Sequence, residues 1–248
     1  TRQLFTEIFF TARDGLRLYG RRYAAPGSTR RPVLCLAGLT RNSRDFHEIA
    51  VALSGTGAGA RDVFTLDSRG RGRSAHDPAW KNYSVPVEMN DVLDFMTLTG
   101  LHDAAVIGTS RGGLIAIMMA AARPAAIGAL VLNDIGPVLE RTGLARIIAT
   151  VGRVPRPVDW PEATRVMKEL NARQFPGISD AEWDAITRQW FNDAGSRPVP
   201  GYDPNIARSI ALPHGPLPEF WPQFAALARV PILALRRPDD GILGEEFA

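Results

Sequence analysis

The 248-residue sequence contains a single cysteine, Cys35, and no long hydrophobic run. One cysteine cannot form an internal disulfide, so nothing requires an oxidising compartment, and its place in the apolar run 33–36 predicts a buried, unreactive thiol. No segment reaches the roughly 18 uninterrupted apolar residues of a membrane span, and no signal-like stretch begins the chain. We therefore expect a cytoplasmic protein with no membrane partner. A leader removed before Thr1 is left open by the sequence.

Lysine is also scarce. Only Lys81 and Lys168 occur, so nearly all of the 29 basic side chains are arginines, balanced by 26 acidic ones. No basic run is interleaved with aromatic residues, and we therefore expect no nucleic-acid partner. Only four histidines are present. Since neither a cluster of histidine and cysteine nor a phosphate-cradling glycine loop occurs, no metal or organic cofactor is expected.

The most informative segment is 108–113, which reads Gly-Thr-Ser-Arg-Gly-Gly. An apolar run over 104–107 precedes it and another over 114–122 follows it, which predicts a strand, a tight turn and a helix. The glycines permit a sharp turn and a close approach of strand and helix, so the side chain of Ser110 is left exposed at the apex. An incidental serine in a glycine-rich turn is the alternative. The two flanks favour a serine nucleophile.

Short apolar stretches alternate with helix-like stretches along most of the chain, which predicts a parallel sheet covered on both faces. The alternation stops between 137 and 218, where helix-like pieces follow one another between proline and glycine breaks and no strand is convincing. We expect an α/β core over 1–136 and 219–248 and a helical insertion over 137–218, after the sixth strand. The predicted elements are a hairpin over 7–10 and 16–23, strands over 33–36, 62–66, 104–107, 129–132 and 231–235, and helices over 43–53, 85–98, 114–122, 161–171, 180–191 and 219–227.

A serine nucleophile also needs donors for the negative charge that develops on the attacked oxygen. In a turn of this kind, one donor is the amide that follows the serine, here that of Arg111. The second comes from the loop after an earlier strand, and the loop Ala37–Thr40 fits this requirement, with Leu39 as the chosen donor. The alternative for this loop is an ordinary strand-to-helix turn.

These landmarks, in this order, resemble the α/β-hydrolase superfamily in its cap-bearing branch. In that branch the pattern D-x-R-G-x-G-x-S, matched here by 67–74, is a structural loop in which Arg69 need not touch substrate. The resemblance implies an α/β-hydrolase fold with a helical cap, from which the last strand and helix are absent in this chain. Members with serine at the turn are esterases, lactonases, metal-free peroxidases and carbon–carbon bond hydrolases. Those that attack alkyl halides or epoxides carry aspartate there, so Ser110 argues against them.

The resemblance also implies an acid that orients the catalytic histidine, in the segment after the strand 231–235. Asp240 occupies the aligned position, and Asp239 replaces it if the register slips by one residue. Asp134 is a second fallback, because some members carry the acid one strand earlier.

The histidine itself is expected beyond Ala248, in the loop after the last strand. None of the four histidines of the chain occupies the family position. The best substitute for the base among them is His214, near the end of the insertion. Either the protein continues past Ala248, or it is complete and has lost its base. We expect a continuation, because losing the last strand would expose an edge of a buried parallel sheet.

The resemblance predicts a serine hydrolase, carboxylesterase-like, that cleaves a small or medium ester or lactone through an acyl-enzyme. A carbon–carbon bond hydrolase with the same serine remains an alternative. A ligand-binding protein without turnover is a third possibility, if no histidine follows Ala248. The expected partner is a small-molecule substrate, and the sequence gives no indication of the oligomeric state.

Overall fold

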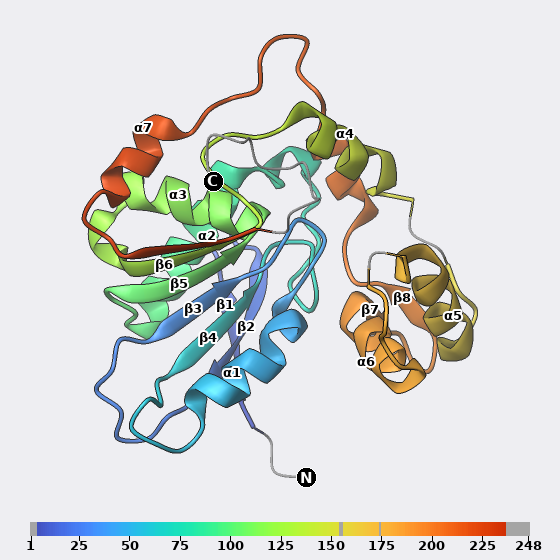
Figure 1. Ribbon diagram of the computed structural model, residues 1–248, viewed down its shortest axis with the longest axis horizontal. Coiled ribbons are helices and arrows are strands. Elements are labelled where there is room, and N and C mark those ends of the chain that lie inside the picture. The colour runs from blue at the N-terminus through green and yellow to red at the C-terminus, as the bar shows by residue number, and fades with distance from the viewer. Residues whose placement is uncertain (1–3, 154–155, 174, 237–248) are drawn as a thin grey trace.

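A seven-stranded sheet forms the centre of the protein (Figure 1). The structure, a computed structural model, describes residues 4–153, 156–173 and 175–236. The strand order is β1-β2-β4-β3-β5-β6-β9; β2 is antiparallel to β1 and β4, and the other pairs are parallel. The sheet strands are β1 (Thr6–Thr11), β2 (Arg17–Tyr23), β3 (Val33–Leu36), β4 (Val63–Asp67), β5 (Ala104–Thr109), β6 (Ile127–Asn133) and β9 (Ile232–Leu235). The helices between them are α1 (His47–Ser54), α2 (Val85–Thr99) and α3 (Arg111–Ala122), with 3₁₀ turns at Ser43–Phe46, Trp80–Asn82 and Pro124–Ala126.

Both faces of the sheet are covered, as the short apolar strands predict. Successive side chains of a strand point to opposite faces. In β3, Leu34 and Leu36 therefore join the larger core under α2 and α3, whereas Val33 and Cys35 join a second core under α1. Cys35 is fully buried, and this burial raises the pKa of its thiol, as expected for an unreactive side chain.

The order of the strands reverses at β3. The chain first moves from β3 to β4 on one side and then crosses back to place β5 on the other side. In open parallel sheets, ligands bind at the carboxyl ends of the strands at such a switch point. The loop that begins at Ala37, after β3, and the turn at Ser110, after β5, both lie at this edge.

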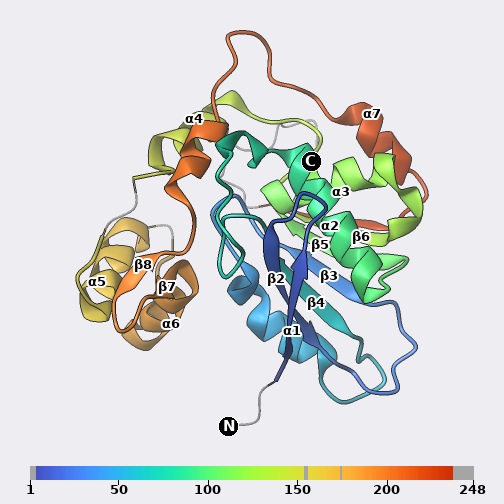
Figure 2. The same ribbon diagram turned by 180° about the vertical axis from the view of Figure 1, so that it is seen from behind.

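Between β6 and β9 the chain leaves the sheet and forms a lobe beside it, seen in both views (Figures 1 and 2). We call residues 137–218 the inserted segment. Its elements are α4 (Arg141–Thr150), α5 (Trp160–Asn171), α6 (Asp180–Trp190), β7 (Phe191–Asp193), β8 (Pro198–Pro200) and a 3₁₀ stretch at Pro204–Ser209. The expectation of no strand here is wrong, because β7 and β8 pair as an antiparallel hairpin. Three-residue strands give no periodic signal, and proline, present at both ends of β8, is tolerated because every strand of a two-stranded hairpin is an edge.

The β7–β8 hairpin is fastened to loops at the carboxyl edge of the sheet. Asn192 donates to the Gly72 carbonyl over 2.7 Å, and the Gly72 amide donates to the Gly201 carbonyl over 2.8 Å. Just before the hairpin, the Gln189 carbonyl at the end of α6 accepts from Asn42 over 3.1 Å. These bonds hold the inserted segment against the loops that follow β3 and β4.

The chain returns to the sheet through a helix shorter than predicted. Only α7 (Trp221–Phe224) is α-helical, and a 3₁₀ turn at Ala225–Leu227 follows it. Pro222 has no N–H and fits only the first turn of a helix, so the helix cannot begin as early as Glu219. The packing of α7 against α3 leads the chain into β9, beside β6.

Candidate active site

Ser110 lies at the turn between β5 and α3 in a strained backbone conformation. Its φ of 49° and ψ of −114° fall in a region that residues with a side chain rarely adopt. The amide of Ser110 donates to the Asn133 carbonyl of β6 over 2.9 Å, which fixes the turn against the neighbouring strand. The predicted strand, turn and helix are therefore confirmed. Strained backbone of this kind clusters at functional sites.

The glycines beside Ser110 let one stretch of backbone meet another. A Cβ on Gly108 would lie within 3.0 Å of main-chain atoms of Gly113, and one on Gly112 would lie within 3.0 Å of the Leu36 carbonyl. Real Cβ atoms essentially never come this close. The turn that exposes Ser110 thus depends on the absence of side chains at these positions.

A cleft of about 80 Å³ opens beside Ser110. Leu39 and Arg111, from the two predicted donor positions, line it together with the serine. The other lining residues are mainly apolar and come from α3, from the end of β6 and from the inserted segment: Leu114, Ile135, Leu139, Glu140, Leu144, Ile147 and Ile210. A mainly apolar wall around one hydroxyl suits an uncharged, apolar substrate group.

Two main-chain N–H groups at this cleft have no acceptor in the described part of the chain. Over residues 4–153, 156–173 and 175–236, no oxygen accepts a hydrogen bond from the amides of Leu39 and Arg111. Gly38 brings the first loop close, since a Cβ there would lie 3.9 Å from the Cβ of Ser110. Arg111 is the first residue of α3, and a helix N-terminus carries partial positive charge. Both amides can therefore stabilise a negative charge that develops next to Ser110.

Behind the cleft, the carboxylate of Glu88 joins two arginines, a feature that the sequence reasoning missed. It accepts from Arg71 and from Arg111 over 2.7 Å each, and Arg71 also donates to the Leu39 carbonyl over 2.7 Å. Burial alone would raise the pKa of Glu88, but the charges of the two arginines outweigh it and hold the pKa below its ordinary value. The helical spacing could have indicated this residue. Glu88 precedes the buried Val92 by four residues and so lies on the buried face of α2, where a carboxylate is unusual because apolar side chains are the rule.

Arg69 is buried away from the cleft, in the structural role that the loop predicts. Its guanidinium donates to Asp91, Asp77 and Asp14 over 2.5 to 2.8 Å. Burial opposes the charged form, but these carboxylates raise the pKa of Arg69 above its ordinary value. The side chain ties together α2, the loop after β4 and the turn of the β1–β2 hairpin.

Of the three carboxylates expected as orienting acid, the structure describes only Asp134. It follows β6 with a φ of 58°, and its amide donates to the Leu235 carbonyl of β9 over 2.8 Å. The next residue, Ile135, lines the cleft, so Asp134 lies at the same edge of the sheet as Ser110. Asp239 and Asp240 lie outside the described residues.

Within the described residues, no histidine lines the cleft at Ser110. His47 packs on the α1 face of the sheet, where its Nδ1 lies 2.9 Å from the Tyr23 hydroxyl. The other three, His76, His102 and His214, are exposed. The expected base is therefore not supplied by the part of the chain that the structure describes.

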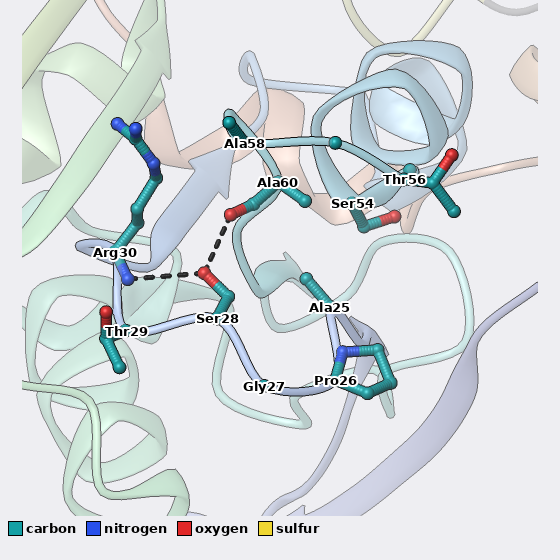
Figure 3. A pocket seen from close by; sticks show the side chains of 12 residues that line it. Ala25, Pro26, Gly27, Ser28, Thr29, Arg30, Ser54, Thr56, Ala58 and Ala60 are labelled. Atoms are coloured by element: carbon teal, nitrogen blue, oxygen red, sulfur yellow. Dashed lines mark hydrogen bonds between the residues drawn. The ribbon is translucent and has the colours of Figure 1, made fainter.

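A larger hollow, of about 430 Å³, lies between the β2–β3 and α1–β4 connections (Figure 3). These connections lead into β3 and β4, so the hollow is at the amino ends of the parallel strands, opposite to Ser110. One of its two serines, Ser28, donates to the Ala60 carbonyl over 2.7 Å and accepts from the Arg30 amide over 3.2 Å. Among the described residues, those that line this hollow include neither a histidine nor a carboxylate, and it offers no acid–base pair.

Neither a cluster of metal-binding side chains nor a membrane-spanning helix occurs in the described ranges. No group of three or more histidine, cysteine, aspartate or glutamate side chains lies together there in a way that could hold a metal ion. The helices of this part of the chain are also too short or too polar to cross a membrane.

Comparison with known proteins agrees with the fold. Residues 31–231 match the profile of the alpha/beta hydrolase fold family, and the chain therefore belongs to that family. A crystal structure of an alpha/beta hydrolase from Novosphingobium aromaticivorans superposes with a TM-score of 0.88 at 34% identity, covering 99% of this chain and 86% of the other.

Two curated relatives are hydrolases with named substrates. The 3-hydroxybutyrate-oligomer hydrolase of Cupriavidus necator is 29% identical, over 87% of this chain and 75% of its own length. The sn-1-specific diacylglycerol lipase ABHD11 of Danio rerio is 30% identical over 58% of this chain, and the match spans only 48% of the lipase. These likenesses support hydrolase activity for this chain.

Proposed function

We propose that this protein is a serine hydrolase that cleaves carboxylic esters or lactones, with Ser110 as the nucleophile. The observation that carries the proposal is the geometry at the end of β5. A strained serine lies at the cleft between two loops whose Leu39 and Arg111 amides have no acceptor in the described residues. The names of the two curated relatives, an oligomer hydrolase and a lipase, support an ester as substrate.

The reaction follows from the chemistry of a serine hydroxyl. The Oγ of Ser110 attacks the carbonyl carbon, its proton passes to a general base, and the π electrons of the C=O bond move to the oxygen. The resulting oxyanion accepts hydrogen bonds from the Leu39 and Arg111 amides. Its collapse breaks the bond to the alcohol oxygen, which takes the proton from the base. Water then attacks the acyl-serine by the reverse sequence of proton transfers, releasing the acid and restoring Ser110.

For the group that orients the base, we retain Asp240, with Asp239 and Asp134 as alternatives. A carboxylate in this role fixes the tautomer of the histidine and stabilises its protonated form. The base is assigned to none of the four histidines in the chain, since none lines the cleft in the described residues.

We further propose that the inserted segment, residues 137–218, acts as a cap over a core of 1–136 and 219–248. Leu144 and Ile147 of α4 and Ile210 contribute to the wall of the cleft, which supports a role for the segment in substrate selection. The small, mainly apolar cleft favours short, uncharged acyl groups.

The test uses the full-length protein, p-nitrophenyl butyrate as substrate and a fluorophosphonate probe with the labelled residue located by mass spectrometry. We expect turnover and labelling at Ser110. Ser110→Ala should abolish the label and lower kcat/KM by at least about 10³-fold. Ser28→Ala is the matched control, because Ser28 lines the hollow at the opposite edge of the sheet, and it should leave both readouts unchanged.

Binding of the ester without turnover or label would contradict the proposal and favour a ligand-binding protein. Faster hydrolysis of a β-diketone than of the ester would favour a carbon–carbon bond hydrolase with the same serine.

A further inference from the structure

One buried carboxylate connects the two loops that present the free amides. Glu88 lies in the first turn of α2 with its side chain 1% exposed. One of its oxygens accepts from Nη1 of Arg71 and the other from Nε of Arg111, each over 2.7 Å. Both acceptor atoms of the carboxylate are thus committed to separate arginines.

Each arginine in turn fixes one of the two donor positions. Nε of Arg71 donates to the carbonyl of Leu39 over 2.7 Å, which restrains the conformation of that residue. Arg111 is itself the residue after Ser110, and its Nη2 donates to the Tyr83 carbonyl over 3.0 Å, so its side chain is held at two points. A shift of Glu88 would therefore loosen the Leu39 loop and the start of α3 together.

The three side chains also carry an unbalanced charge. Two guanidinium groups face one carboxylate, and the exposed fractions are 1% for Arg71, 1% for Glu88 and 13% for Arg111. Guanidinium groups remain charged in proteins, so the cluster holds a net positive charge behind the Ser110 turn. In a setting of low dielectric constant, such a charge acts on a nearby anion more strongly than it would in water.

Stability alone gives a weak reason for this arrangement. Removing charges from water is costly, and well-packed apolar side chains often replace a buried ion pair with no loss of stability. The bonds of this cluster to the Leu39 loop and to the start of α3 instead indicate a role in positioning the two amides.

We propose that Glu88 is a positioning residue for the oxyanion site: through Arg71 and Arg111 it sets the Leu39 and Arg111 amides at the geometry that the transition state requires. The inference rests on the proposed function, because it assumes attack by Ser110 at the same cleft.

A second ion pair on the same helix supplies a matched control. Asp91 lies three residues after Glu88, is also 1% exposed, and accepts from Arg69 over 2.7 and 2.6 Å. The other carboxylates that bind Arg69 are Asp14 and Asp77, and none of these residues lines the cleft. Asp91→Asn therefore removes an equally buried charge from α2 without breaking a bond to either donor position.

The experiment measures Glu88→Gln and Asp91→Asn in the full-length protein with p-nitrophenyl butyrate and with its thionoester, in which sulfur replaces the carbonyl oxygen. Sulfur is a weak hydrogen-bond acceptor on a longer bond, so the oxo-to-thiono ratio of kcat reports how well the amides meet the oxyanion. Urea unfolding of each variant reports the loss of stability.

We expect Glu88→Gln to lower kcat with the oxoester by about 10- to 100-fold, less than the 10²- to 10³-fold typical of deleting a donor, with KM nearly unchanged and a reduced oxo-to-thiono ratio. Asp91→Asn should lose comparable stability and keep both kcat and the ratio within about twofold. If Glu88→Gln does not fold, Arg71→Met replaces it, and its effect on kcat and on the oxo-to-thiono ratio reports the support of the Leu39 loop. If Asp91→Asn does not fold, Asp14→Asn replaces it as the control.

Loss of stability in Glu88→Gln with kcat and the ratio intact would overturn the proposal, and so would an equal fall of the ratio in Asp91→Asn. Failure of the proposed function has a different signature. In that case Ser110→Ala remains active, or the probe labels another residue, whatever the behaviour of Glu88.

Discussion

The hydroxyl of Tyr83 donates to Oδ2 of Asp203 over 2.5 Å and so joins the start of α2 to the inserted segment. The same hydroxyl accepts from the Asp77 amide over 2.8 Å, and the Asp203 amide donates to the Gly70 carbonyl over 2.8 Å. Both side chains are buried. Because the carbonyl of Tyr83 accepts from Arg111, the attachment of the inserted segment and the position of the serine turn share one residue.

The first prediction concerns this attachment. Tyr83→Phe leaves a buried carboxylate without one of its donors, and we expect it to lower the free energy of unfolding by about 1–3 kcal/mol. Limited proteolysis of the folded protein should then cut faster within residues 137–218. Tyr19→Phe is the control, since the Tyr19 hydroxyl binds Glu7 within the β1–β2 hairpin. Equal proteolysis of the two variants would show that the Tyr83 hydroxyl does not hold the segment.

The second prediction concerns the closest approach of α3 to the sheet. Gly112→Ala places a methyl group against the Leu36 carbonyl, where neither backbone can yield without moving the turn. We expect a loss of stability of about 1–3 kcal/mol or more in urea unfolding, together with weaker labelling of Ser110. Gly59→Ala has open space around its new methyl group and should be nearly neutral. A Gly112→Ala variant as stable and as reactive as the parent would contradict the described packing.

The third prediction separates the candidate acids. If Asp240 orients the base, Asp240→Asn lowers kcat by about 10⁴-fold, because an amide in this place favours the wrong histidine tautomer. Asp239→Asn and Asp134→Asn should then change kcat far less. Steady-state kinetics of the three variants decides the assignment, and the largest effect at Asp134 would move the acid to the strand before the inserted segment.

The fourth prediction concerns acid pH. The pKa of Glu88 in the folded protein lies below its ordinary value of 4.5, so the folded state binds its proton less readily than the unfolded state. The stability that Glu88 contributes is therefore present above about pH 4.5 and is lost as the pH falls through the lowered pKa. Arg71 and Arg111 face this carboxylate, and Asp91 is a nearby acid on the same helix.

Thermal unfolding between about pH 3 and pH 7 measures this contribution. The melting temperature of Glu88→Gln should fall less steeply below about pH 4.5 than that of the parent. If the melting temperatures of the parent and of Glu88→Gln fell in parallel with pH, the Glu88 carboxylate would have the same proton affinity in the folded and unfolded states.

The core of the fold could be predicted because its signals are local. The strands β3 to β6 are short apolar runs between helix-like stretches, and their observed limits differ from the expected ones by two residues or fewer. The turn at Ser110 could be predicted for the same reason, since the glycines that make it possible lie within two residues of the serine. Its family landmarks then indicated Leu39 and Arg111 as the neighbouring donors.

The features that were missed depend on partners far apart in the chain. Glu88 binds Arg71, 17 residues before it, and Arg111, 23 residues after it, and no local pattern predicts that pairing. Asn192 of the β7–β8 hairpin binds Gly72 and Arg44, both more than 100 residues earlier. The assignment of Asp240 stays a prediction, because it lies outside the described residues.

The crowding around the serine turn also determines which of its positions are open to redesign. A Cβ on Gly108 or Gly112 would meet backbone atoms, and one on Gly113 would meet the Ile135 side chain, so none of the three can be exchanged without moving its surroundings. Apart from the serine, this leaves Thr109 and Arg111. Of these, Arg111 lines the cleft, but its side chain is held by Glu88 and by the Tyr83 carbonyl, so a change there also alters the support of the amide that it carries. A library confined to position 111 would therefore vary the charge beside the nucleophile and the support of the turn at the same time.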